Sequence, residues 1–120
     1  MTVDYFINNW ENIDERDIDF SIIEWETISM YQYLEEDFIR KFKKELNWRL
    51  ISLYQKLTED FIIEYKDYVS WFDVSMYQKL SGRFIAKMNH YIIPAYLKYN
   101  ESLELNIKYQ YKLGESILIL

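Results

Sequence analysis

Cysteine is absent from this 120-residue sequence, and glycine, proline and histidine are scarce, with two, one and one copies respectively. The lack of cysteine excludes disulfide scaffolds, thiolate zinc sites and thiol nucleophiles, and it is typical of a reducing intracellular compartment. Two glycines leave no room for a glycine-rich phosphate loop. Few turn residues beside 19% aromatic residues favour helices packed through large side chains over a turn-rich β protein. The fold class expected is therefore mainly α.

Long apolar runs are missing as well. No run approaches the roughly 18 residues that a membrane-spanning helix needs, and the first residues lack the basic start of a signal peptide. We therefore expect a protein without a membrane segment that stays in the cytoplasm of the cell that makes it. The length suits one domain over residues 1–120.

A unit of 23 residues recurs three times in register over residues 24–92. Its framework positions are Trp25, Trp48 and Trp71; Ser29, Ser52 and Ser75; Tyr31-Gln32, Tyr54-Gln55 and Tyr77-Gln78; Leu34, Leu57 and Leu80; and Phe38-Ile39, Phe61-Ile62 and Phe84-Ile85. Self-similarity at a fixed period of this size indicates identical units that bury their apolar faces against one another. The pattern predicts three helical repeats that form an α-solenoid-like stack.

Each repeat is expected to be a helical hairpin. In the middle copy Asn47 is a favoured N-cap residue, so a helix should begin at Trp48. Thr58 restarts the pattern, because it is a capping residue followed by Glu59 and Asp60, whose charges suit the start of a helix. The first helix is apolar nearly all round and is expected inside the protein. The second is amphipathic and is expected outside, with one wet face.

The two ends of the chain depart from the repeat. Residues 93–120 form a degenerate fourth copy in which Pro94 stands at the tryptophan position, where proline suits the first turn of a helix. From 103 to 113 apolar and polar residues alternate, which predicts a strand with one buried face. Gly114-Glu115 then suits a tight turn, so a C-terminal β-hairpin is expected. A helix is the alternative there, because every fourth residue also continues the repeat register.

Residues 1–23 are expected to cap the stack, since terminal units of repeat proteins are atypical. A short helix should open after Thr2, with Phe6 and Trp10 on its apolar face. Residues 11–24 give a poor signal and are expected to be mostly irregular, with a hint of extended structure at 18–22.

The sequence contains no catalytic signature. The one histidine, His90, has no cysteine to activate and no second imidazole, and its repeat equivalents Lys44 and Asp67 put it on the solvent side of a helix. Glu35-Glu36-Asp37 is expected to start a helix, with acid/base or metal chemistry as the alternative. We therefore expect a protein that is not an enzyme and has no cofactor or metal. An enzyme that uses a carboxylate-bound Mg²⁺ is the remaining alternative.

Three repeated polar positions have a structural and a functional interpretation. The serines are expected to let neighbouring helices approach closely, in preference to acting as nucleophiles. The glutamines are expected to hydrogen-bond to a turn of the adjacent repeat, because a buried amide needs partners, with a ladder that reads a ligand as the alternative. The tyrosines of the Tyr-Gln pairs are expected in the core, in preference to forming a binding platform.

Charge is distributed unevenly. Residues 11–37 hold ten acidic residues and one base, Arg16, for a net −9, whereas residues 38–120 carry thirteen bases and nine acids, or +4. This asymmetry favours a basic protein partner at the front of the chain and disfavours direct nucleic-acid binding there. A solvated segment that only keeps the protein soluble is the alternative. The candidate partner-binding residues are Glu11, Asp14, Glu15, Asp17, Asp19, Glu24, Glu26, Glu35, Glu36 and Asp37.

The stretch from Trp48 to Ile62, W-R-L-I-S-L-Y-Q-K-L-T-E-D-F-I, resembles a tandem repeat of bacteriophage and large DNA virus proteins, close to W-x-x-I-S-x-Y-Q-x-L-S-E-D-F-I. The third copy departs from it at Gly82-Arg83, where the acidic pair is missing. The resemblance covers residues 25–92 and carries no catalytic residue. It implies a viral origin and a binding role.

A small acidic protein of this origin is similar in outline to anti-CRISPR proteins and other inhibitors of bacterial immunity. By that analogy, its acidic front docks on a basic nucleic-acid-binding groove of a bacterial host protein and occupies the place of the phosphate backbone. The alternative is a helical-repeat adaptor or scaffold with no inhibitory role. A homodimer, paired through an exposed edge near Leu120 or the apolar flank of a terminal repeat, stays open.

Overall fold

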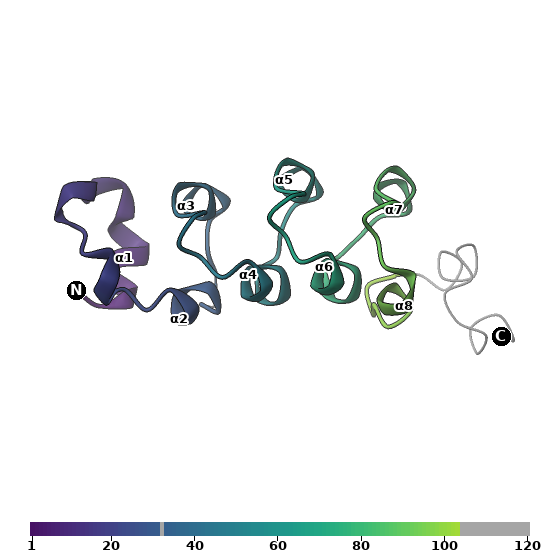
Figure 1. The fold of residues 1–120 in the computed structure, drawn as a ribbon, viewed down its shortest axis with the longest axis horizontal. Helices are drawn as coiled ribbons and strands as arrows, with labels where there is room; N and C mark the ends of the chain where they lie inside the picture. Colours follow the sequence, from purple (N-terminus) through teal and green to yellow (C-terminus); the bar gives the residue numbers. More distant parts are fainter. Residues whose placement is uncertain (32, 104–120) are drawn as a thin grey trace, which may run out of the picture.

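The computed structural model describes residues 1–31 and 33–103. Within those residues it contains eight α-helices, three short 3₁₀ helices and no strand (Figure 1). The prediction of a mainly α protein is therefore confirmed. The predicted C-terminal β-hairpin lies outside the described residues. None of the described helices is long and apolar enough to cross a membrane.

The α-helices that follow the cap alternate between two rows along an elongated molecule that measures 57 × 21 × 19 Å (Figure 1). The first row comprises α2 (Trp25–Ser29), α4 (Trp48–Tyr54), α6 (Trp71–Tyr77) and α8 (Pro94–Leu97). The second row comprises α3 (Glu36–Lys41), α5 (Glu59–Glu64) and α7 (Gly82–Lys87). In the first row α4 packs against α2 and α6, and α6 packs against α8. Successive repeats therefore meet mainly through their first helices.

The predicted capping residues begin these helices. Asn47 Oδ1 accepts a hydrogen bond from the backbone N–H of Leu50 at 3.1 Å, and Thr58 Oγ1 accepts one from Phe61 at 3.2 Å. Ser70 and Ser81 do the same in the third copy. The first copy has no side-chain cap at either helix, and its α2 has only five residues. Pro94 opens α8, as its place in the repeat predicts.

Each repeat tryptophan has the same setting. Its indole Nε1 donates to the carbonyl five residues earlier, which belongs to Phe20, Lys43 and Lys66 in turn, at 3.2, 2.8 and 2.8 Å. The rings of Trp48 and Trp71 stack on a phenylalanine of the second row, with ring centroids 6.2 and 6.3 Å apart. The tryptophans thus hold the end of one repeat to the two helices of the next.

The repeated serines link neighbouring repeats. Ser52 Oγ donates to Trp48 O at 2.7 Å and accepts from the backbone N–H of Ser70, in the next repeat, at 2.9 Å. Ser29 makes the equivalent pair of bonds, and Ser75 accepts from Ile93 at 3.0 Å. All three serines are completely buried. They therefore serve the packing of the stack, as expected, and none is placed to act as a nucleophile on an external substrate.

The repeated glutamines form hydrogen bonds with the backbone of the preceding repeat. Gln78 Nε2 donates to Ser52 O at 2.7 Å and to Gln55 O at 2.6 Å, while its Oε1 accepts from Leu57 N at 3.0 Å. Gln55 makes the corresponding bonds to the first copy. Asn100 takes over the donor role in the fourth copy. The prediction of buried amides bonded to an adjacent turn is confirmed for Gln55 and Gln78, and Gln32 lies outside the described residues.

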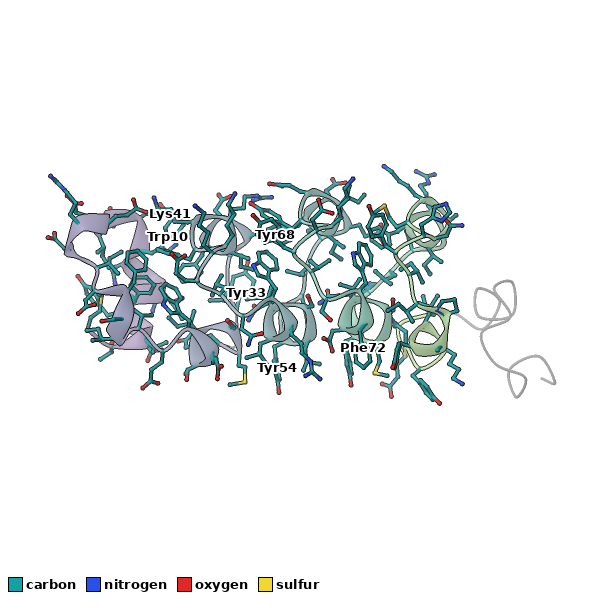
Figure 2. The ribbon with its side chains drawn as sticks, in the orientation of Figure 1. Trp10, Tyr33, Lys41, Tyr54, Tyr68 and Phe72 are labelled. Atoms are coloured by element: carbon teal, nitrogen blue, oxygen red, sulfur yellow. The ribbon has the colours of Figure 1, made fainter. Side chains whose placement is uncertain are left out.

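Two expectations about the first helix of each repeat were wrong. The first row is not enclosed, because one side of it faces solvent. Tyr54 and Tyr77, expected in the core, are each 53% exposed. Each is the last residue of its helix, and Figure 2 shows Tyr54 pointing away from the second row, whereas the glutamine that follows each tyrosine is buried. In the first copy Tyr31 is half-buried, and its hydroxyl donates to a carboxylate oxygen of Asp4.

The N-terminal cap packs on the first repeat through aromatic rings. It begins with α1 (Val3–Asn9), which opens after Thr2 as predicted, and it continues through 3₁₀ helices at Trp10–Asn12, Glu15–Asp17 and Phe20–Ile22. The suggestion of extended structure at residues 18–22 was wrong for the 3₁₀ helix Phe20–Ile22. Asp19 Oδ1 accepts from the backbone N–H of Ser21 at 3.1 Å, which bends the chain into a 3₁₀ turn.

Candidate partner-binding surfaces

The ten acidic candidates gather at the N-terminal end of the elongated molecule. Residues 11–19 lie in the cap, residues 24 and 26 at the start of α2, and residues 35–37 at the start of α3 (Figure 1). Nine are exposed, and Glu36 is half-buried. The fold therefore does bring the predicted residues to one region, although their roles there differ.

Three of the acids are paired with bases of this chain. Asp14 bonds to Arg16 at 2.7 Å, and Glu15 bonds to Lys41 Nζ at 2.8 Å. Asp37 bonds to Arg40, which also reaches Glu64 of the next repeat at 3.0 Å. Hydrogen bonds from Arg16 lower the pKa of Asp14. These pairs reduce the negative charge that the front presents to a partner.

Two further acids cap backbone groups. Asp19 accepts from the hydroxyl and the backbone N–H of Ser21, and these bonds lower its pKa. Glu36 accepts from the backbone N–H of Thr58 at 2.8 Å and from its hydroxyl at 3.0 Å. Thr58 begins the second helix of the next repeat, so Glu36 joins two repeats. Helix α3 begins at Glu36, as expected, and the Glu36 side chain also supports the start of α5 in the next repeat.

Four of the predicted acids, Glu11, Asp17, Glu26 and Glu35, make no side-chain hydrogen bond or ion pair to another described residue. Glu11 and Glu35 come from different elements, yet they line one small pocket of about 220 Å³. The same pocket is lined by two aromatic residues, Trp10 and Tyr33, both labelled in Figure 2. Carboxylates beside aromatic rings attract a cation through charge and through the ring faces. We call this the front pocket.

A second surface runs beside the segments that join the two rows. It is an open groove of about 1220 Å³ between the second and third repeats, lined by Tyr54, Lys56, Asp60, Tyr77 and Lys79. A smaller hollow of about 360 Å³ occupies the corresponding place one repeat earlier. We call the larger hollow the tyrosine groove. The prediction of buried tyrosines missed this groove; the sequence shows that the tyrosine recurs in each copy, but only the structure shows that it ends a helix.

Two sequence-based candidates for chemistry, a metal site and His90, can be placed in the part of the chain that the structure describes. No group of histidine, aspartate and glutamate side chains among the residues described could hold a metal ion. His90 is exposed, as its repeat position predicts.

Comparison with known proteins adds no relative. No family model matches the chain, and neither does any curated protein or solved structure. A function has to be argued from the two surfaces themselves.

Proposed function

We propose that this chain is a non-enzymatic, protein-binding inhibitor, encoded by a bacteriophage and directed at a defence system in the cytoplasm of its bacterial host. In this proposal the chain is an α-solenoid-like stack that places its acidic front on a basic nucleic-acid-binding groove. The repeat resemblance supports the viral origin. The front pocket carries the binding proposal, because Glu11 and Glu35 stand there beside Trp10 and Tyr33 without a cation of their own among the described residues.

A basic groove offers the groups that the front pocket suits. Arginine and lysine side chains that normally hold phosphates would meet exposed carboxylates, and one of them would enter the front pocket beside Trp10 and Tyr33. The attraction between exposed charges is screened within about 8 Å at physiological salt. Binding is therefore expected to weaken steeply as the salt concentration rises.

The proposal is tested with the full chain and guide-loaded CRISPR effectors, purified and assayed one at a time for cleavage of target DNA. We expect the chain to inhibit at least one effector at about 50 mM salt and to lose most of its inhibition at about 500 mM. The variant with Glu11→Lys and Glu35→Lys should lose inhibition. The variant with Asp67→Lys and Glu101→Lys makes the same change in net charge on exposed residues away from the front, and it should keep inhibition.

Two outcomes overturn the proposal. One is a panel in which no effector is inhibited. The other is an equal loss of inhibition in the two charge-reversal variants, which would mean that net charge matters and the front pocket does not. Circular dichroism of both variants checks that the helices are intact.

The second candidate is a helical-repeat adaptor with no inhibitory role. The exposed Tyr54 and Tyr77 favour it, because they lie along the repeats, outside the acidic front. Exposed tyrosines are common in binding sites, since they combine a large apolar ring with a hydroxyl. An adaptor would keep its partner when Glu11 and Glu35 are reversed.

A further inference from the structure

The tyrosine groove repeats the same chemistry at two successive positions. Tyr54 is followed two residues later by Lys56, and Tyr77 by Lys79, and all four side chains are exposed. Neither lysine forms an ion pair with a described residue. Glu59, at the start of α5, is already engaged, because it accepts from the backbone N–H of Ser81 at 2.7 Å. The groove therefore offers two rings and two ammonium groups, together with the carboxylates of Glu59 and Asp60, of which only Asp60 has no described partner.

The floor of the tyrosine groove needs no hydrogen bond from a ligand. The amides of Gln55 and Gln78 lie there, and both are bonded to backbone groups within the stack. No buried side-chain nitrogen or oxygen among the described residues lacks a partner. A ligand is thus held by contact with the rings and by charge, and its backbone does not have to hydrogen-bond to the protein as an added β-strand would.

The spacing of the repeats selects the shape of such a ligand. Helices α4 and α6 pack directly against each other, so their axes are about 8 to 10 Å apart, and we take this as the spacing of equivalent positions in the two repeats. A polyproline II helix rises about 3.1 Å per residue with three residues per turn, which returns the same face every 9.3 Å or so. A β-strand returns the same face every 6.6 Å or so, which falls out of register at the second position.

Charge selects the side chains. Residues 38–103 carry eleven bases and seven acids, or +4, whereas the front carries the excess of acid. An acidic segment is therefore attracted to the repeats and repelled by the front. Its carboxylates suit Lys56 and Lys79, and prolines pack well on exposed tyrosine rings, as they do in other aromatic-lined grooves that bind proline-rich segments.

We propose that the tyrosine groove binds a polyproline II segment of a partner protein that presents a carboxylate at every third residue, of the type Glu-Pro-Pro. Successive carboxylates pair with Lys56 and Lys79, and the prolines between them lie on Tyr54 and Tyr77. This goes beyond the proposed inhibitory function, because it uses a different surface and a partner of opposite charge.

The test measures binding of fluorescent peptides to the full chain by anisotropy. The probe contains four copies of Glu-Pro-Pro, which span about 37 Å. A second peptide with four copies of Glu-Pro-Pro-Pro has the same charge in the wrong spacing, and a third has Lys-Pro-Pro. We expect the first peptide to bind at least about tenfold more tightly than either of the others.

Matched variants locate the site. The variant with Lys56→Glu and Lys79→Glu should lose at least about tenfold in affinity, and so should the variant with Tyr54→Ala and Tyr77→Ala. The controls are Lys44→Glu with Lys66→Glu, and Tyr5→Ala, which change exposed residues elsewhere and should bind normally. All of these residues are exposed, so the helical circular dichroism should not change.

Three results would overturn the groove proposal: no binding of the Glu-Pro-Pro peptide, equal binding of the two spacings, or an equal loss in the lysine control. The variant with Glu11→Lys and Glu35→Lys should bind the peptide as well as the unchanged chain does. Failure of the inhibitor proposal therefore leaves this one standing, and the reverse is also true.

Discussion

Where the N-terminal cap meets the first repeat, the fully buried contacts are between aromatic rings and the polar contacts are exposed or half-buried, whereas a ladder of buried side-chain hydrogen bonds holds the junction between the second and third repeats. In the cap Phe6 lies 5.9, 5.7 and 5.2 Å from Trp25, Phe38 and Phe42, measured between ring centroids. At the repeat junction the single amide of Gln78 makes three bonds to backbone groups. Both junctions cover an apolar end, but only the second has a buried amide that fixes the register of its neighbour.

The difference follows from what each junction must satisfy. The segments that connect the helices of a repeat carry backbone groups which the next repeat buries, and each buried group needs a partner. A glutamine can serve a donor and two acceptors at once, but only when the neighbouring repeat sits in one position. Aromatic rings tolerate small shifts and demand no such fit. Neighbouring repeats therefore need their buried polar residues to keep one register, whereas the buried aromatic contacts of the cap do not need them.

If the buried amide holds the repeat junction and nothing like it holds the cap, removing the amide should have the largest effect on stability. Gln78→Leu keeps the volume roughly constant and leaves the N–H of Leu57 and the carbonyls of Ser52 and Gln55 without their partner. We expect a loss of about 4 kcal/mol in the free energy of unfolding, because each unsatisfied buried group costs about 1 to 3. Urea denaturation followed by tryptophan fluorescence measures it. A loss below about 1 kcal/mol would show that water replaces the amide and that the ladder is not what holds the junction.

The cap is probed by Phe6→Ala. Phe6 is 1% exposed, and truncating a buried phenylalanine usually costs about 3 kcal/mol or somewhat more. Here the loss should stay in the cap, so hydrogen exchange should speed up in α1 and remain slow in α4 and α6. Phe6→Ala should thus destabilise the cap locally, whereas Gln78→Leu should destabilise the stacked repeats. Equal acceleration in α6 would mean that cap and repeats unfold together.

Much of the fold could be predicted because the same sequence pattern occurs three times. Capping residues, tryptophan positions and the bonded glutamines all recur, and a recurring pattern reduces the chance of a wrong reading. The tyrosines were misplaced for a physical reason: a ring at the last position of a short helix can leave the row, and periodicity alone does not show where the helix ends.

The candidate site was harder to predict, since sequence shows charge and does not show partners. Glu36 and Asp19 look like the other acids of the front, but the fold uses them as caps. The signal for Glu36 was present, because the glutamate of each acidic pair stands 22 residues before a helix-starting Thr58 or Ser81. The front pocket was not visible, because Glu11 and Glu35 come together only through the packing of the cap on the first repeat.

The smallest loss of stability is expected at the second contact between repeats, in which a glutamate accepts hydrogen bonds from the residue that starts a helix of the next repeat. Glu59→Ala removes the carboxylate that accepts from the N–H and the hydroxyl of Ser81 at 2.7 and 3.0 Å. Helix caps of this kind contribute about 1 kcal/mol, so we expect a loss of that size and faster hydrogen exchange at the start of α7. The control is Glu35→Ala, whose exposed carboxylate has no described partner and should change stability by less than about 0.5 kcal/mol. If both variants lose the same amount, the glutamate acts through general charge, and the polar ladder of Gln55, Gln78 and Asn100 alone distinguishes the repeats from the cap.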